Sequence, residues 1–323
     1  MTEKSDLLIW ALIDDRAGNK SQCLGVAEAL GLAFQTRALE YAAAAALPNI
    51  ALGATFKGLS ESARLALAPP WPDMVISAGR RTAPVARNIK KLNGGKTFLA
   101  QIMYPGDLGV GDFGLIAAPS HDPLRERPNL MTITGAPHQA TAAALEKAAG
   151  EWRAAFKDLP RPWTALMVGG STKRRVFTKE MARELGRIAN MRAKMLEGSL
   201  LVSTSRRSED AAEALFAEIT RPSHIYKWGD EGGNPYLGYL ALADAVIVTG
   251  DSVSMCSEAC ATTGPVYIFA PKKLTVAKHG HLHRELYELG HARPLDGTFT
   301  AWKHPPLNAA LAIAAEIRAR MGI

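Results

Sequence analysis

The chain has 323 residues, of which 47% are hydrophobic and 21% are charged. This balance excludes a disordered or fibrous chain, and the length favours two domains over one. The net charge of +7 suits an anionic ligand or a membrane surface, but the basic residues form no dense stripe of the kind that marks nucleic-acid-binding proteins.

The three cysteines give no sign of a disulfide or a metal site. Cys23, Cys256 and Cys260 form no Cys-x-x-Cys pair, and no histidine stands at ligand spacing beside them, so small core residues are favoured. The first apolar run ends at Asp14 with no basic segment before it, which predicts a strand and not a signal peptide. No apolar stretch is long enough to span a membrane. We expect a cytoplasmic protein and leave peripheral association with the inner face of the membrane open.

Short apolar runs alternate with helical patterns in the first half of the chain. Strands are predicted at 6–14, 32–40, 72–79, 96–103, 113–119 and 129–135. Helices are predicted over 19–31, after the third strand, and over about 139–156. The alanine-rich segment 41–59 is interrupted by a proline and a glycine, which predicts an irregular helical excursion.

A proline-punctuated break at 157–163 precedes a second run of the same alternation. Its strands are predicted at 164–170, 198–205, 224–228, 245–250 and 265–269, with a last amphipathic helix at 307–321. The predicted fold class is α/β, with two Rossmann-like doubly wound domains facing across a cleft. The expected domains are 1–158 and 159–306, followed by a C-terminal helix, 307–323, that packs on either domain.

Glycines and basic doublets follow many of the predicted strands. The sequences after six of them are DDRAGN, GRRT, GGSTKRR, SRRS, GDSVS and APKK. Ligands of open α/β sheets bind at the carboxyl ends of the strands. Glycine lets backbone N–H groups approach a ligand, and arginine or lysine neutralises phosphate oxygens. A single pair of basic residues after a strand usually lies on the solvated surface. Four of these six segments carry such basic doublets or triplets at the same kind of sheet edge, which favours an anionic ligand in the cleft.

The exit GDSVS connects a buried strand to a helix. Asp251 or Ser252 is the expected N-cap, and the hydroxyls of Ser252 and Ser254 lie where free N–H groups attract an anion. Simple capping is the alternative. Other candidates for contact with the same anion are Gly169, Gly170, Ser171, Ser205 and Arg206. Neither GxGxxG nor GxxxxGK[ST] is present, which disfavours a dehydrogenase or a P-loop NTPase.

Several motifs together resemble the mitochondrial fission protein family, named for a plant elongated-mitochondria protein, in its alphaproteobacterial branch. They are WALIDDRAGNKSQ, PDMVISAGRRTAPVA, PSHD, TITGAPH, GGS and VTGDSVSMCSEACATTGPV, spread over nearly the whole chain. The resemblance implies a GT-B-like fold with a nucleotide-sugar site in the C-terminal domain. One departure stands out: an Asp-Pro-Arg-like sequence is expected after LAQI, where this chain has MYPGDLG.

The resemblance also implies roles for individual residues. Glu258 would hold the ribose of a nucleotide-diphospho-sugar, and Ser252 with Ser254 would hold its diphosphate. UDP is one option for the nucleotide, and the acceptor is unknown. No metal or further cofactor is expected, because helix ends and basic side chains can stabilise a departing diphosphate.

An inverting transfer needs a general base, which we expect in the N-terminal domain. The candidates at strand exits are Asp14, Asp15, the pair His121 and Asp122, and His138, with Asp14 and His121 preferred. The histidines of KHGHLH resemble a metal-binding tract, but the predicted loop has no acidic partners, so surface or cleft lining is favoured.

Two further functions stay open beside the glycosyltransferase. A sugar-nucleotide epimerase on the same fold would use several carboxylates and a histidine, for which Glu258, Asp251, Asp122 and His121 are available. A non-enzymatic adaptor would recruit a partner or a membrane, as the family name suggests, and would tolerate replacement of the basic residues.

Overall fold

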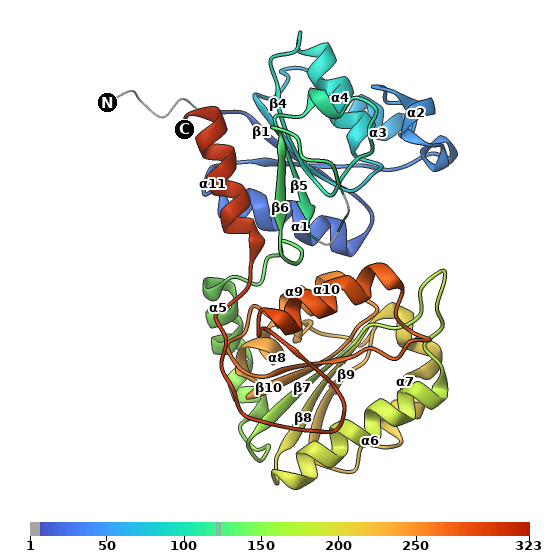
Figure 1. Cartoon of the computed structure of the whole chain (residues 1–323), viewed down its shortest axis with the longest axis vertical. Helices are drawn as coiled ribbons and strands as arrows, with labels where there is room; N and C mark the ends of the chain where they lie inside the picture. Colours follow the sequence, from blue (N-terminus) through green and yellow to red (C-terminus); the bar gives the residue numbers. More distant parts are fainter. Residues whose placement is uncertain (1–6, 121, 123) are drawn as a thin grey trace. The chain divides into compact units, whose positions relative to one another are not determined.

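The structure is a computed structural model that describes residues 7–120, 122 and 124–323. The described chain divides into two compact units, which Figure 1 shows. Unit 1 comprises the residues up to Gln139 together with Ala309–Ile323, and unit 2 comprises Ala140–Asn308. Each unit is built on a parallel sheet with helices on both faces. The predicted α/β class with two doubly wound sheets is confirmed.

In the described part of unit 1, six parallel strands lie in the order β2-β1-β3-β4-β5-β6. Their bounds are β1 Ile9–Ile13, β2 Gln35–Ala38, β3 Met74–Ala78, β4 Phe98–Ile102, β5 Leu115–Pro119 and β6 Leu130–Ile133. The central strands are apolar along most of their length because helices cover both faces of the sheet. The strand order reverses between β1 and β3, so their carboxyl ends mark the switch point of this sheet.

Helices of unit 1 cover both faces of its sheet. They are α1 Ala17–Ala29, η1 Ala43–Ala46, α2 Asn49–Leu52, α3 Glu61–Leu65, α4 Ala83–Leu92, η2 Val110–Asp112 and α11 Ala309–Met321. The segment predicted as an irregular excursion contains η1 and α2, and an antiparallel bridge joins its ends, Tyr41 and Leu59. Helices α3 and α4 contribute to one apolar cluster, and α1 and α11 contribute to the other.

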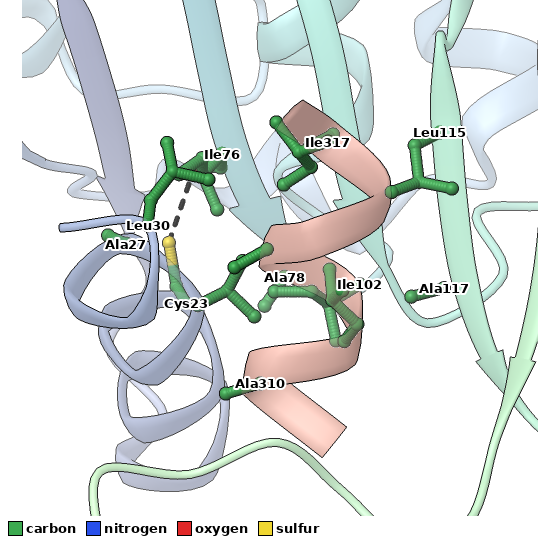
Figure 2. Packing of buried hydrophobic residues seen from close by; sticks show 14 of the residues in the cluster. Cys23, Ala27, Leu30, Ile76, Ala78, Ile102, Leu115, Ala117, Ala310 and Ile317 are labelled. Atoms are coloured by element: carbon green, nitrogen blue, oxygen red, sulfur yellow. Dashed lines mark hydrogen bonds between the residues drawn. The ribbon is translucent and has the colours of Figure 1, made fainter. Parts of the chain in front are cut away.

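The last helix, α11, lies beside α1 in unit 1 (Figure 1). Its Ala310 and Ile317 join a buried cluster that includes Cys23 and Ile76 (Figure 2). The Cys23 thiol donates a hydrogen bond to the carbonyl oxygen of Ile76 at 3.3 Å, and burial raises the pKa of this thiol to about 12. Cys23 is therefore a core residue, as predicted.

In the described part of unit 2, six parallel strands lie in the order β12-β11-β10-β7-β8-β9. Their bounds are β7 Trp163–Val168, β8 Ser199–Thr204, β9 Ser223–Tyr226, β10 Ala245–Thr249, β11 Val266–Phe269 and β12 Arg293–Pro294. Strand β12 was not predicted, because two residues are too few to show a periodic pattern. Strands β10, β7 and β8 are neighbours, so the loops after them share one edge.

The helices of unit 2 are α5 Ala142–Trp152, η3 Arg153–Phe156, α6 Lys179–Met195, η4 Arg206–Ser208, α7 Glu209–Phe216, α8 Tyr236–Leu242, α9 Val253–Ala259 and α10 Ala277–Glu288. Helices α6 and α7 pack on one face of the sheet, and α5, α8, α9 and α10 pack on the other. The tract KHGHLH lies in α10, so its prediction as a loop was wrong. No helix in the described ranges is long and apolar enough to cross a membrane.

Helix α5 belongs with unit 2, although the proline-rich break after it was the expected domain boundary. Its Trp152 packs so closely on α8 that a Cβ at Gly238 would stand 2.7 Å from the indole Cδ1. Trp152 also stacks on Phe156, with ring centroids 6.2 Å apart and nearly parallel ring planes. Along the chain, the boundary between the two units therefore falls between Gln139 and Ala140 and not after residue 158.

Candidate functional site

Three loops at one edge of the unit 2 sheet form a single hydrogen-bonded structure. They are Gly169–Ser171 after β7, Ser205–Arg207 after β8 and Gly250–Ser252 after β10. We call these nine residues the cradle. The Gly169 N–H donates to Thr249 Oγ1 at 2.7 Å, which ties the first loop to the end of β10. The Ser205 hydroxyl donates to the carbonyl oxygen of Gly169, which ties the second loop to the first.

The glycine pair of the cradle is required by close packing. A Cβ at Gly169 would lie 2.5 Å from both carboxylate oxygens of Asp251. Gly170 has φ +135°, a conformation that side chains rarely adopt, and a Cβ there would lie 2.2 Å from the carbonyl oxygen of Arg207. Contacts within the protein alone therefore exclude any residue larger than glycine at these two positions.

A buried carboxylate holds an arginine at the cradle. The side chain of Asp251 is 0% exposed, and its Oδ2 accepts from the Gly170 N–H at 3.1 Å and pairs with Arg207 Nη1 at 2.6 Å. The Arg207 side chain is 34% exposed, so it is fixed by Asp251 while part of it still meets solvent. Asp251 Oδ1 has no hydrogen-bond partner among the described residues. Asp251 thus positions Arg207 and is not itself exposed to a ligand.

The arginine in this network is Arg207, whereas the sequence pointed to its neighbour. Arg206 is exposed and starts the short helix η4, and its side chain makes no hydrogen bond within the described ranges. A buried aspartate is stabilised by a cationic partner, and the structure supplies Arg207 as the partner of Asp251. The pattern of residues could not show which arginine of the doublet turns inward.

The serines of the cradle mostly hold the loops together. Ser252 is the N-cap of α9, and its Oγ accepts from the Met255 N–H at 3.4 Å. Ser171 Oγ accepts from the Phe177 N–H at 3.0 Å. Helix α9 has seven residues, so its dipole is small. Attraction for an anion at this edge therefore depends mainly on the arginines. Ser254, in the first turn of α9, is half-buried.

Glu258 is held in place by a tyrosine from another helix. The Tyr236 hydroxyl, at the start of α8, donates to Glu258 Oε2 at 2.7 Å. Burial, and then the charge of Glu258, raise the pKa of Tyr236 well above its ordinary value, so Tyr236 stays protonated and acts as the donor. The sequence did not identify this tyrosine, because the two residues are 22 positions apart.

The first unit carries a separate charged cluster where β1 and β3 end. Arg81 pairs with Asp14 at 2.7 Å and also with Asp15, and its guanidinium lies 4.1 Å from the ring centroid of Tyr41. The other oxygen of Asp14 accepts from Asn19 Nδ2 at 3.1 Å. Asp14 is buried and both of its oxygens are bonded, which suits an anchor for Arg81 better than a general base.

Asp15 at the same strand exit is more accessible. Its side chain is 61% exposed, and hydrogen bonds with Asp14 and Arg81 lower its pKa. His121, the second preferred candidate for the base, lies outside the described residues. His138 is fully buried, and a Cβ at Gly25 would lie 2.6 Å from the His138 backbone. Asp122 is half-buried.

The histidines of α10 do not form a metal site in the described part of the chain. His279 and His283 stand one turn apart, and His281 is exposed while His283 is buried. No group of three or more His, Cys, Asp or Glu residues with metal-binding geometry occurs among the described residues. Cys256 and Cys260 are buried free thiols, and burial raises the pKa of Cys260 to about 12.

Sequence comparison finds relatives whose similarity extends over most of the chain. The sequence model of the family described as Mitochondrial fission ELM1 matches residues 17–321. The Mitochondrial fission protein ELM1 of Arabidopsis thaliana is 31% identical over 294 residues, covering 83% of this chain and 68% of the plant protein. An uncharacterized protein of Rickettsia prowazekii (strain Madrid E) is 29% identical over 346 residues, covering 96% of this chain and 97% of that protein.

Solved structures with the same fold include two sugar-related enzymes. The UDP-GlcNAc 2-epimerase of Methanocaldococcus jannaschii has a TM-score of 0.62 at 12% identity and covers 98% of this chain and 100% of its own. The spinosyn forosaminyltransferase SpnP has a TM-score of 0.56 at 14% identity and covers 98% and 95%. At these identities the similarity shows the fold, which is GT-B-like.

Proposed function

Because the chain belongs to the Mitochondrial fission ELM1 family and has a GT-B-like fold, we propose that it is a glycosyltransferase that binds a nucleotide-diphospho-sugar at the cradle of unit 2. The observation that carries this proposal is the pairing of Arg207 with the buried Asp251 beside Gly170. A fixed, partly exposed guanidinium at the carboxyl ends of parallel strands suits a diphosphate.

The geometry of Arg207 supports contact with phosphate oxygens. Asp251 and two backbone carbonyl groups engage Nη1 of the guanidinium. Arginine has five N–H donors in a planar fork, so Nη2 and Nε are left for a ligand. Arg206 adds a second positive charge from the same loop. In the proposed reaction these charges stabilise the diphosphate as it departs, without a metal or a further cofactor.

We propose UDP as the nucleotide. The structurally similar epimerase is named for UDP-GlcNAc, which supports this choice. Glu258 is the proposed ligand of the ribose, with Tyr236 holding its carboxylate in one orientation. Transfer to an acceptor also needs a base, and Asp15 in unit 1 has the exposure that Asp14 lacks.

An epimerase is the second candidate, since the epimerase structure has a TM-score of 0.62 with this chain. Epimerisation would convert the nucleotide-sugar into an isomer without any acceptor, whereas transfer releases the nucleoside diphosphate only when an acceptor is present. Product analysis by chromatography with and without a lipid or glycan acceptor separates the two reactions. An adaptor of this family would give neither product.

Ligand-induced stabilisation tests the proposal directly. UDP and UDP-sugars are expected to raise the melting temperature, because a ligand that binds only the folded state stabilises it by about 2.7 kcal/mol at 100 times its Kd. Thermal unfolding is measured with millimolar UDP, ADP, GDP and CDP and their sugars. If no nucleotide shifts the transition, the nucleotide-sugar proposal is wrong and the adaptor is favoured.

The Tyr236→Phe variant is expected to bind UDP about tenfold more weakly. The phenol–carboxylate hydrogen bond is of the charged kind, which contributes roughly 1.5–3 kcal/mol, and its loss frees Glu258 from the orientation suited to a ribose. Calorimetry with UDP and 2′-deoxy-UDP should show that the wild type prefers UDP and that this preference is smaller in the Tyr236→Phe variant. Tyr226→Phe is the matched control, since among the described residues its hydroxyl donates only to the carbonyl oxygen of Asp230, at 3.4 Å. Equal affinities in wild type and Tyr236→Phe would contradict the role of Glu258.

A further inference from the structure

A pocket of about 540 Å³ lies within unit 2, next to the cradle. It is lined by the end of β11 and the loop after it, by the first turns of α10, by residues at β12, and by Glu184 of α6. None of the nine cradle residues lines it. Its volume is in the range of small-molecule sites, and neither the family nor the proposed function accounts for it.

The basic side chains that line the pocket outnumber its acidic side chains. Lys272 and Arg284 line it, and neither makes an ion pair or hydrogen bond within the described ranges. Thr275 also lines it, and its Oγ1 is buried without a hydrogen-bond partner among the described residues. Glu184 is the acidic residue of the lining, so two lysine or arginine charges face one carboxylate. A ligand carboxylate or phosphate would satisfy the donors that the protein leaves unpaired.

The remaining walls of the pocket are largely apolar. Phe269, Pro271, Val276, Tyr287 and Leu295 line it beside the charged groups. Pockets of this composition hold an organic body against apolar walls and orient it by a few polar contacts. We propose that this pocket binds a sugar-sized organic anion, with its carboxylate or phosphate at Lys272, Arg284 and Thr275.

The pocket and the cradle share a wall. A Cβ at Gly250 of the cradle would lie 2.6 Å from His283 Cε1 and 3.0 Å from the Ala270 Cβ, and both of these residues line the pocket. The same anionic chemistry therefore has two sources. It is either an acidic glycosyl group of a nucleotide-sugar held in the cradle, which rests on the proposed function, or a separate sugar phosphate or acid.

One residue offers a clean way to close the pocket. Gly280 lines it from α10, and a Cβ there would have no atom within 4 Å. A Gly280→Leu side chain is thus expected to enter the empty space without a clash. Because leucine has a much higher helix propensity than glycine, the variant should fold.

Binding is measured by calorimetry on the full chain, with two pairs of probes. UDP-glucuronate is compared with UDP-glucose, and glucose 6-phosphate is compared with glucose in the absence of nucleotide. At least one pair is expected to show an anion preference of about tenfold, the usual gain from a charge-assisted hydrogen bond. Lys272→Met and Gly280→Leu should abolish the preference. Lys273→Met is the matched control, because Lys273 is exposed and does not line the pocket.

The outcomes separate this inference from the proposed function. A preference for UDP-glucuronate identifies the glycosyl group as the source, and a preference for glucose 6-phosphate identifies a separate anion. If UDP does not bind but glucose 6-phosphate does, the pocket stands and the proposed function falls. The absence of any anion preference, or a preference that persists in both Lys272→Met and Gly280→Leu, overturns the inference even if UDP binds.

Discussion

Replacing Arg207 with methionine is expected to lower UDP affinity about 10- to 100-fold and to destabilise unit 2 as well. The affinity falls because charged hydrogen bonds to phosphate contribute roughly 1.5–3 kcal/mol. The stability falls because the carboxylate of Asp251, with 0% exposure, loses its cationic partner. Breaking such a pair costs about 3–5 kcal/mol when both groups are buried, and about 2–3 kcal/mol is expected here since Arg207 is one-third exposed. Calorimetry and urea unfolding measure the two effects.

A double variant separates the two roles of Arg207. In Arg207→Met/Asp251→Asn the uncompensated charge is gone, so most of the lost stability should return. UDP affinity should stay low, because the phosphate ligand is still missing. Arg206→Met is the matched control within the doublet and should leave stability unchanged, since Arg206 is exposed. If the double variant regains wild-type UDP affinity, Arg207 does not contact the nucleotide.

The Gly170→Ala variant is expected to lose about 3 kcal/mol or more of unfolding free energy. Two costs combine at this position. The backbone has φ +135°, and the new Cβ would lie 2.2 Å from the carbonyl oxygen of Arg207 and 2.5 Å from the Ser208 nitrogen. These are backbone atoms, so the cradle must open to make room, and UDP binding should be lost together with stability. Urea unfolding and UDP calorimetry test both expectations.

Gly150→Ala is the matched control for this change. Gly150 is exposed in α5 of the same unit, and a Cβ there would meet no atom within 4 Å. Alanine in a helix is about 1 kcal/mol better than glycine, so the control should be more stable than the wild type by up to that amount. A Gly170→Ala protein as stable as the wild type would show that the loops after β7 and β8 are not packed as described.

Much of the fold could be predicted from local patterns. A strand that is covered on both faces is expected to be largely apolar, and β3, β7, β8 and β10 are buried along their length and carry mostly apolar residues. Two elements were missed: β12 has only two residues, and the tract KHGHLH was predicted as a loop although it lies in the 12-residue helix α10. The helix α5 was assigned to the wrong side of the boundary, because its partner, Gly238 of α8, is far away in the sequence.

The candidate site, like the fold, was visible only in part from the sequence. Glycines, serines and arginines at the strand ends were visible in the sequence, because parallel strands bring their carboxyl ends to one edge. The partners within that edge were not visible. Gly170 and Asp251 are 81 positions apart, Tyr236 and Glu258 are 22 apart, and the inward turn of Arg207 depends on the buried carboxylate it meets.

The sequence by itself determined the α/β class, the succession of buried strands and the glycine-rich and basic character of the loops after them. Hydrophobic periodicity and turn chemistry are local, so they can be recognised without a partner. The tertiary structure alone decided which arginine is anchored, which carboxylate is buried beneath it, and where a pocket with unpaired cations forms. Ion pairs and cavities depend on residues brought together from distant parts of the chain. A local sequence pattern does not show which of these residues come into contact.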